Sequence, residues 1–126
     1  LDALRARDLT ISVAESGTAA RFGSFLLAEP AASGLVLDIT SSALEREPPS
    51  AITLAESSRK RTGSDAGVGV VLTILPVELG LYDGVVEVAV TGALESVASF
   101  PIRAAFIEIQ RRSAMHAADL LRRSML

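Results

Sequence analysis

The segment from Val68 to Leu75 constrains the fold of this chain more than any other. Apart from one glycine and one threonine, its residues are all valine, leucine or isoleucine (VGVVLTIL). A strand without polar alternation is typical of a sheet that is covered on both faces. Segments with helical periodicity lie on either side and can supply the covering layers. The run therefore predicts an α/β fold.

Further segments complete the predicted sheet and its helices. Strands are expected at 9–14, 34–40, 68–75 and 85–90, with a shorter one at 97–100; helices are expected at 19–28 and 50–62, and a final helix is expected to begin at Pro101. Residues 76–84 are interpreted as a turn-rich connection. This order predicts a three-layer α/β/α sandwich with a mixed, mostly parallel sheet. We expect residues 1–126 to form a single domain.

Capping residues and apolar spacing define the limits of the predicted helices. Pro30 is expected to end the first helix. Ser50 can cap the second helix and Gly63 can end it, while Pro101 suits the first turn of the last one. The residues expected to face the core are Phe22, Phe25, Leu26, Leu27, Ile52, Leu54, Ala55, Phe106, Ile109, Met115, Ala117, Leu120 and Leu121.

The composition argues against several kinds of site and partner. The chain has no cysteine and a single histidine, so neither a disulfide framework nor a metal site is expected. A net charge of −3, with few aromatic residues, argues against nucleic-acid binding. No apolar run approaches the roughly 20 residues of a membrane span, and there is no basic-then-apolar leader. We therefore expect a cytoplasmic protein that has no membrane partner.

A small polar cluster lies where the first predicted strand gives way to a helix, in the stretch VAESGTAA (13–20). The carboxyl end of a strand that opens a helix is where α/β proteins usually hold a ligand. Ser16 and Thr18 offer hydroxyl groups there, and the start of the helix offers unpaired N–H groups. Glu15, Ser16, Gly17 and Thr18 are therefore the candidate catalytic and ligand-binding residues.

This stretch resembles the A-E-S-C-T-G-G motif that opens the CinA carboxy-terminal domain, the nicotinamide-mononucleotide deamidase family. Residues 50–61 are similar to a family helix written S-E-E-V-A-x-x-M-A-E-G-A-R, and Ser64-Asp65-Ala66-Gly67 resembles the family's A-D-I-G turn. The resemblance covers nearly the whole chain. It implies a CinA-like fold and a reaction in which a serine attacks the amide of nicotinamide mononucleotide. Ser16 matches that nucleophile.

Other family motifs are missing from the chain. A Y-S-N-E-x-K stretch should fall between Gly34 and Pro48, but that region has neither Tyr nor Lys. The T-G-I-A-G-P loop falls on residues 71–76, where only the proline matches and Thr73 lies two positions late. Alanines at 19 and 20 replace the motif's paired glycines, and Arg103 is only near the position of the family's arginine.

These departures leave three hypotheses open. The leading one is a degenerate CinA-like domain that acts as a structural or ligand-sensing module in a homo-oligomer, without a cofactor. The second is an active amidase in which Thr73 and either Arg103 or Arg111 assist Ser16. The third is a non-catalytic regulator that binds a nicotinamide mononucleotide-type molecule.

The candidate residues also have structural interpretations. Ser16 and Thr18 can serve as helix caps, and Glu15 can complement the helix dipole. His116 suits a partly buried helix position. The terminal arginines, including Arg111, suit a solvated stripe on the last helix.

Overall fold

The computed structural model describes residues 1–126 and contains one five-stranded sheet. The strands are β1 (Ile11–Ser16), β2 (Val36–Ser42), β3 (Ala66–Glu78), β4 (Leu81–Gly92) and β5 (Ser96–Ala104). Their spatial order is β2-β1-β3-β4-β5. The β1 strand pairs in parallel with β2 and β3, whereas β4 runs antiparallel to β3 and β5. Only β4 therefore opposes the common direction, which confirms the mixed, mostly parallel sheet.

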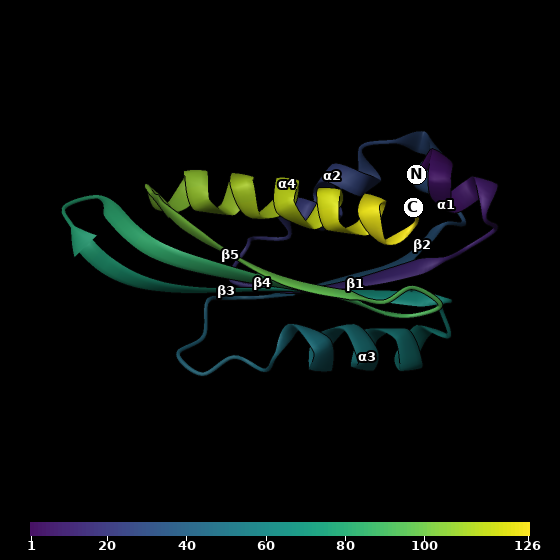
Figure 1. The fold of residues 1–126 in the computed structure, drawn as a ribbon, viewed down its shortest axis with the longest axis horizontal. Helices are drawn as coiled ribbons and strands as arrows, with labels where there is room; N and C mark the ends of the chain where they lie inside the picture. The colour runs from purple at the N-terminus through teal and green to yellow at the C-terminus, as the bar shows by residue number, and fades with distance from the viewer.

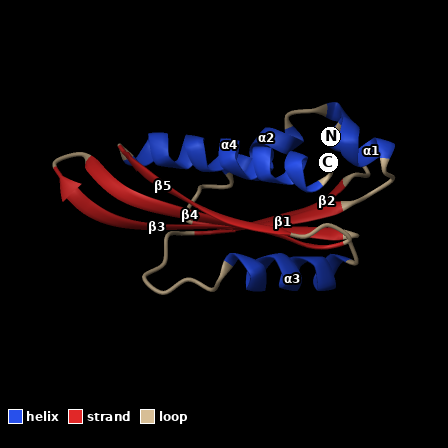
Figure 2. Cartoon of the chain, viewed as in Figure 1, coloured by secondary structure: helices blue, strands red, loops and turns tan.

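Helices cover both faces of this sheet (Figures 1 and 2). They are α1 (Asp2–Ala6), α2 (Arg21–Leu27), α3 (Ala51–Thr62) and α4 (Phe106–Ser124), with a short 3₁₀ turn at Pro30–Ala32. Figure 1 shows α3 alone on one face and α1, α2 and α4 on the other. The predicted three-layer α/β/α sandwich is confirmed. None of these helices is both long enough and apolar enough to cross a membrane.

The centre of the sheet is β3, as the apolar run predicts. Its residues from Ala66 to Leu72 are all buried. On the α3 side, Gly67 and Gly69 bring the sheet into contact with the backbone of the helix. A Cβ atom on Gly69 would lie 2.0 Å from the Ala51 carbonyl oxygen, and one on Gly67 would lie 2.1 Å from that of Ala55. The two glycines thus set the distance between α3 and the sheet.

The predicted limits of α3 are confirmed. The Ser50 side chain accepts a hydrogen bond from the backbone N–H of Thr53, and Gly63 ends the helix in the left-handed conformation at φ 73°. Ala55 is buried, but Ile52 is 47% exposed, so its predicted inward position is wrong. The α3 helix lies on a glycine-bearing strand, and this close contact selects small residues on its inner face.

The predicted connection at 76–84 is instead a hairpin. The β3 strand continues to Glu78 and β4 begins at Leu81, with Gly80 at φ 78° between them. The predicted connection begins at Pro76, but β1 ends opposite Val71, so beyond that point β3 has a neighbouring strand on one side only. Proline is tolerated on such a free edge because no ladder donor is needed there.

Pro101 also lies in a strand, and the predicted start of the last helix is wrong for the same reason. It belongs to β5, which is an edge strand, and α4 begins five residues later at Phe106. The predicted core face of α4 is confirmed at Ile109, Ala117, Leu120 and Leu121, which are buried. It is wrong at Met115, which is 58% exposed. His116 is half-buried, as expected, and its ring stacks on Phe100 at a centroid distance of 4.1 Å.

The apolar face of α2 is narrower than the sequence suggests. Phe22 and Leu26 are buried, whereas Phe25 and Leu27 are 61% and 58% exposed. A helix of only two turns contacts the sheet along one narrow face, which here carries Phe22 and Leu26. Phe25 and Leu27 each lie next to Leu26 in the sequence, so they are rotated away from this face and point outward. Two large apolar side chains of α2 are therefore left on the surface.

Candidate functional site

The predicted polar cluster lies at the carboxyl end of β1, next to the ends of two neighbouring strands. Ser16 pairs with Ser42 of β2 and with Val71 of β3. The strand extends through Glu15 and Ser16, so these residues precede the helix by several positions. Because successive side chains of a strand point to opposite faces, Glu15 and Ser16 lie on different sides of the sheet. The motif is therefore divided between two layers.

Glu15 points to the α2 side and occupies the start of that helix. Its carboxylate accepts hydrogen bonds from the backbone N–H groups of Gly23 at 2.8 Å and Phe22 at 3.3 Å. The hydroxyl of Thr18 donates to the same carboxylate at 2.5 Å. Glu15 is only 2% exposed. An acidic group of the chain itself thus satisfies the N–H groups that an external anion would use.

The predicted capping roles of Ser16 and Thr18 are wrong. The N-cap residue of α2 is Ala20, whose methyl side chain cannot cap the helix. The carboxylate of Glu15 reaches the same N–H groups from the adjacent strand. Its favourable interaction with the helix dipole is as expected, although the carboxylate reaches the helix from β1 rather than from within the first turn.

Ser16 lies on the α3 side of the sheet, together with its strand partner Val71. Its side chain is fully buried, and its Oγ atom has no hydrogen-bond partner. Such an unsatisfied hydroxyl is uncommon and costs roughly 1–3 kcal/mol. No lysine, histidine or carboxylate is within hydrogen-bond distance of this oxygen.

The loop after Ser16 contacts three other parts of the chain, at Ser42, Gln110 and Leu44. The backbone N–H of Gly17 donates to the Ser42 carbonyl at 3.0 Å, and the carbonyl of Gly17 accepts from the Gln110 side chain at 3.2 Å. Gly17 has a φ of 81°, and a Cβ atom there would lie 2.8 Å from Leu44. The sequence did not predict that Gln110 and Leu44 contact this loop, because both residues lie far from the motif in the chain.

Ala19 and Ala20 have left-handed backbone conformations, with φ angles of 54° and 56°. An L-residue with a Cβ atom pays roughly 1–2 kcal/mol for this conformation, which glycine adopts freely. These are the two positions where the resembling motif has glycine. The loop thus retains a backbone shape that suits glycine although its residues are alanines.

Replacing Ala20 with glycine is expected to raise the free energy of unfolding by about 1 kcal/mol. The left-handed strain is removed, and the gain exceeds the roughly 0.4–1 kcal/mol by which glycine stabilises the unfolded chain. Urea denaturation followed by circular dichroism measures the change. The matched control is Ala28→Gly, because Ala28 is exposed with a φ of −65°. A loss of stability in Ala20→Gly as large as that of the control would contradict the expectation.

The predicted helper residues lie apart from Ser16. Thr73 is on the same strand and the same face as Val71, but it is exposed and its hydroxyl donates to the Val85 carbonyl at 3.5 Å. Arg103 lies on β5, three strands from β1 and therefore about 14 Å away across the sheet. It forms a bidentate ion pair with Asp83 at 2.6 and 2.8 Å.

Arg111 lies on α4, on the face of the sheet opposite to Ser16. It forms two hydrogen bonds with the carboxylate of Glu108, which also accepts from Arg112 at 3.0 Å. These two guanidinium groups lower the pKa of Glu108 to about 2. Similarly, hydrogen bonding to Arg122 lowers the pKa of Asp119 from its usual value. The interpretation of the terminal arginines as a solvated stripe with local ion pairs is thus consistent with these contacts.

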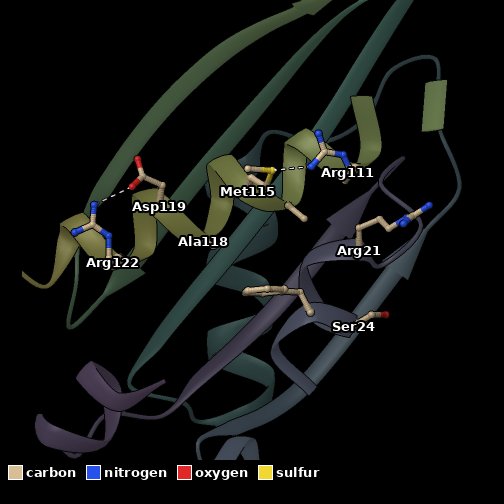
Figure 3. Close-up of a pocket in the computed structure, with 9 residues that line it drawn as sticks. Arg21, Ser24, Arg111, Met115, Ala118, Asp119 and Arg122 are labelled. Carbon is tan, nitrogen blue, oxygen red and sulfur yellow. Dashed lines mark hydrogen bonds and ion pairs between the residues drawn. The ribbon is translucent and has the colours of Figure 1, made fainter. Parts of the chain in front are cut away.

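A cavity of about 780 Å³ lies between α2 and α4 (Figure 3). We call it the α2–α4 groove. It is lined by Arg21, Ser24, Phe25, Arg111, Ala114, Met115, Ala118, Asp119 and Arg122. Arg111, Met115, Ala118 and Arg122 follow one another at helical spacing and so form one stripe along α4. This spacing can be read from the sequence and indicates the α4 side of the groove. The α2 side was not predicted, because Phe25 was expected to face the core.

Nowhere in the structure do three or more His, Cys, Asp or Glu side chains gather as metal ligands. The polar groups of the candidate site are instead a buried carboxylate, an unpaired buried hydroxyl and a set of surface arginines. They do not meet in a single cleft.

Comparisons with known proteins find similarity in structure but not in sequence. No family model matches the sequence, and no curated protein matches it. Among solved structures, one match is a competence-damaged protein (CinA) superfamily protein from Escherichia coli, with a TM-score of 0.77 and 16% sequence identity. The alignment covers 99% of this chain and 85% of the Escherichia coli chain.

Two further solved structures agree with this match. A CinA superfamily protein from Enterobacter cloacae has a TM-score of 0.72 at 13% identity, with 98% of this chain and 86% of the other covered. The competence/damage inducible protein CihA from Agrobacterium tumefaciens has a TM-score of 0.71 at 17% identity, with 98% and 89% covered. The resemblance predicted from the sequence motifs is thus confirmed at the level of architecture: the chain has the fold of the CinA superfamily.

Proposed function

We propose that this chain is a CinA-like domain without amidase activity, and that it serves as a structural or ligand-sensing module. The observation that carries the proposal is the environment of Ser16. Its Oγ atom is buried and has no hydrogen-bond partner. A serine hydroxyl is a weak nucleophile unless an adjacent base accepts its proton. In this environment no group can do so.

The surroundings of the motif support the same proposal. Hydrolysis of an amide needs donors for the developing oxyanion, and a nucleotide needs a cradle for its phosphate. The N–H groups of Phe22 and Gly23 at the start of α2 already bind Glu15. Leu44 closes over Gly17. The methyl groups of two alanines occupy the turn where bare backbone would allow an anion to approach.

Ammonia release from nicotinamide mononucleotide tests the loss of activity. Wild-type protein and Ser16→Ala are assayed side by side with a coupled ammonia assay at high enzyme concentration. We expect both to match the buffer blank, because a buried serine without a base cannot attack the amide. Release by the wild type that disappears in Ser16→Ala would overturn the proposal and restore the active-enzyme alternative. In that case Thr73→Val would test whether Thr73 takes part.

A non-catalytic role in binding nicotinamide mononucleotide is a separate alternative. Thermal-shift titration of the wild-type protein with a panel of mononucleotides, nicotinamide mononucleotide among them, would detect it. Since Glu15 fills the anion position, we expect no shift attributable to a site at Ser16. A concentration-dependent shift that Ser16→Ala abolishes would show that the motif still binds a ligand.

A further inference from the structure

The floor of the α2–α4 groove is apolar and exposed. Phe25 of α2 is 61% exposed and Met115 of α4 is 58% exposed, although each is a large apolar side chain. The half-buried residues Ala114 and Ala118 line the same groove. A concave site of this size, with an apolar floor and a few polar groups at its edges, has the character of a small-molecule site. The floor consists of side chains from two helices that the fold brings together.

The edges of the groove carry an excess of positive charge. Three arginines and one aspartate line it, in a chain whose net charge is −3. Arg111 and Arg122 have carboxylate partners, Glu108 and Asp119 respectively. Arg21 has none, although it is half-buried beside the apolar floor. Charge complementarity thus favours an anionic occupant with an apolar portion.

We propose that the α2–α4 groove binds a small amphiphilic anion. Its apolar portion would lie on Phe25 and Met115, and its carboxylate or phosphate would pair with Arg21. Arg111 lines the same groove and can add a second guanidinium contact. This proposal deepens the ligand-sensing role proposed above and rests on it, because it names the class of ligand that would be sensed.

Two other occupants fit the groove less well. A second copy of the chain, applied through the same face, would bring two sets of arginines together, which is unfavourable because like charges repel. A ligand with a cationic ring would place positive charge beside Arg21 and would be disfavoured for the same reason. The proposed class is therefore an acid with an alkyl or aryl group.

The groove is linked to the motif loop through neighbouring residues. Arg21 directly follows the loop of left-handed alanines and is the first residue of α2. Gln110, next to Arg111 on α4, donates to the Gly17 carbonyl. A ligand that joins α2 to α4 would therefore stabilise the two helices that hold this loop. Such a coupling gives a ligand-sensing domain a route from the groove to the former site.

Calorimetric titration of the full chain with three ligands of equal alkyl length tests the charge preference. The probes are decanoate, decanol and decyltrimethylammonium; the two ionic probes are kept below their micellar concentrations and decanol below its solubility limit. We expect decanoate to bind at least about tenfold more tightly than the neutral and cationic probes, because only it pairs with Arg21. Equal affinity for all three, or no binding of decanoate, would overturn the proposal.

Surface variants locate the site. Arg21→Gln and Phe25→Ser are each expected to weaken decanoate binding about tenfold. The matched controls are Arg46→Gln and Leu27→Ser, because Arg46 is an exposed arginine outside the groove and Leu27 is as exposed as Phe25 on the same helix. The controls should bind decanoate as the wild type does. Equal weakening in the test and control variants would place binding elsewhere and overturn the proposal.

A last experiment distinguishes binding of a free ligand from binding of a membrane surface, because a membrane also presents anionic groups with alkyl chains. The wild-type protein is sedimented with vesicles that contain phosphatidylserine. We expect it to remain in the supernatant. Co-sedimentation that is lost in Phe25→Ser would show that the groove binds a lipid surface and would overturn the free-ligand proposal. None of these readouts depends on ammonia release, so the groove and the loss of amidase activity can fail independently.

Discussion

Replacing Gly69 with alanine is expected to lower the free energy of unfolding by more than about 3 kcal/mol. The added Cβ atom would lie 2.0 Å from the carbonyl oxygen of Ala51 and 3.0 Å from the backbone nitrogen of Ala55. Both contacts are to backbone, so no change of rotamer can relieve them. The helix must move away from the sheet, which opens a packed interface along its length. Insertions of this kind exceed the roughly 1–3 kcal/mol of ordinary overpacking.

Gly84→Ala is the matched control for this prediction. Its Cβ atom would meet the side chain of Ile109 at 3.1 and 3.3 Å, and flexible atoms can move by a few tenths of an ångström. We expect a loss well under half that of Gly69→Ala. Urea denaturation monitored by circular dichroism measures both, and a Gly69 variant with no cooperative transition counts as the larger loss. Similar losses in the two variants would show that α3 does not lie as close to β3 as the structure has it.

The features that the sequence predicted well are those with local causes. The apolar run of β3 reports burial on both faces, and the limits of α3 follow from a capping serine and a glycine in the left-handed conformation. Each of these signals lies within the element that it describes. For such elements the local pattern is sufficient.

The errors share a different cause, which is the position of a strand in the sheet. Pro76 begins the predicted connection and Pro101 begins the predicted last helix, but both lie in strand segments with a free edge. Whether an edge is free depends on where a distant strand ends, and no pattern near the proline reports that. The exposure of Phe25 likewise depends on a distant contact, because it is determined by how α2 packs beside α4.

The location of the candidate site could be predicted from the sequence, but the orientation of its side chains could not. The motif at 13–20 does lie at the carboxyl end of a central strand, next to a helix. What could not be predicted is that β1 continues beyond residue 14, through Glu15 and Ser16, so that these two side chains lie on opposite faces. Because a shift of one residue in register would exchange the two faces, the pairing of β1 decides that Ser16 faces α3 and Glu15 faces α2. The α2–α4 groove depends in addition on a contact between segments about ninety residues apart.

Replacing Glu15 with glutamine is expected to lower the free energy of unfolding by about 3 kcal/mol. The two side chains have nearly the same shape, but one carboxylate oxygen becomes an NH₂ group. At one position that group would face the backbone N–H of Gly23, and at the other the backbone N–H of Phe22, both of which are donors to Glu15 in the wild type. Hydrogen bonds to a charged group contribute roughly 1.5–3 kcal/mol each, and a buried donor without an acceptor adds its desolvation cost.

Glu29→Gln is the control for the loss of a negative charge, because Glu29 is exposed just beyond the same helix. Its stability should lie within about 0.5 kcal/mol of the wild type, as for other surface substitutions. Urea denaturation measures the stabilities, and amide hydrogen exchange at Phe22 and Gly23 reports the local effect. We expect both amides to exchange faster in Glu15→Gln, since their acceptor is weakened. If their protection and the overall stability were unchanged, the carboxylate would not cap α2, and the start of that helix would be available to an external anion after all.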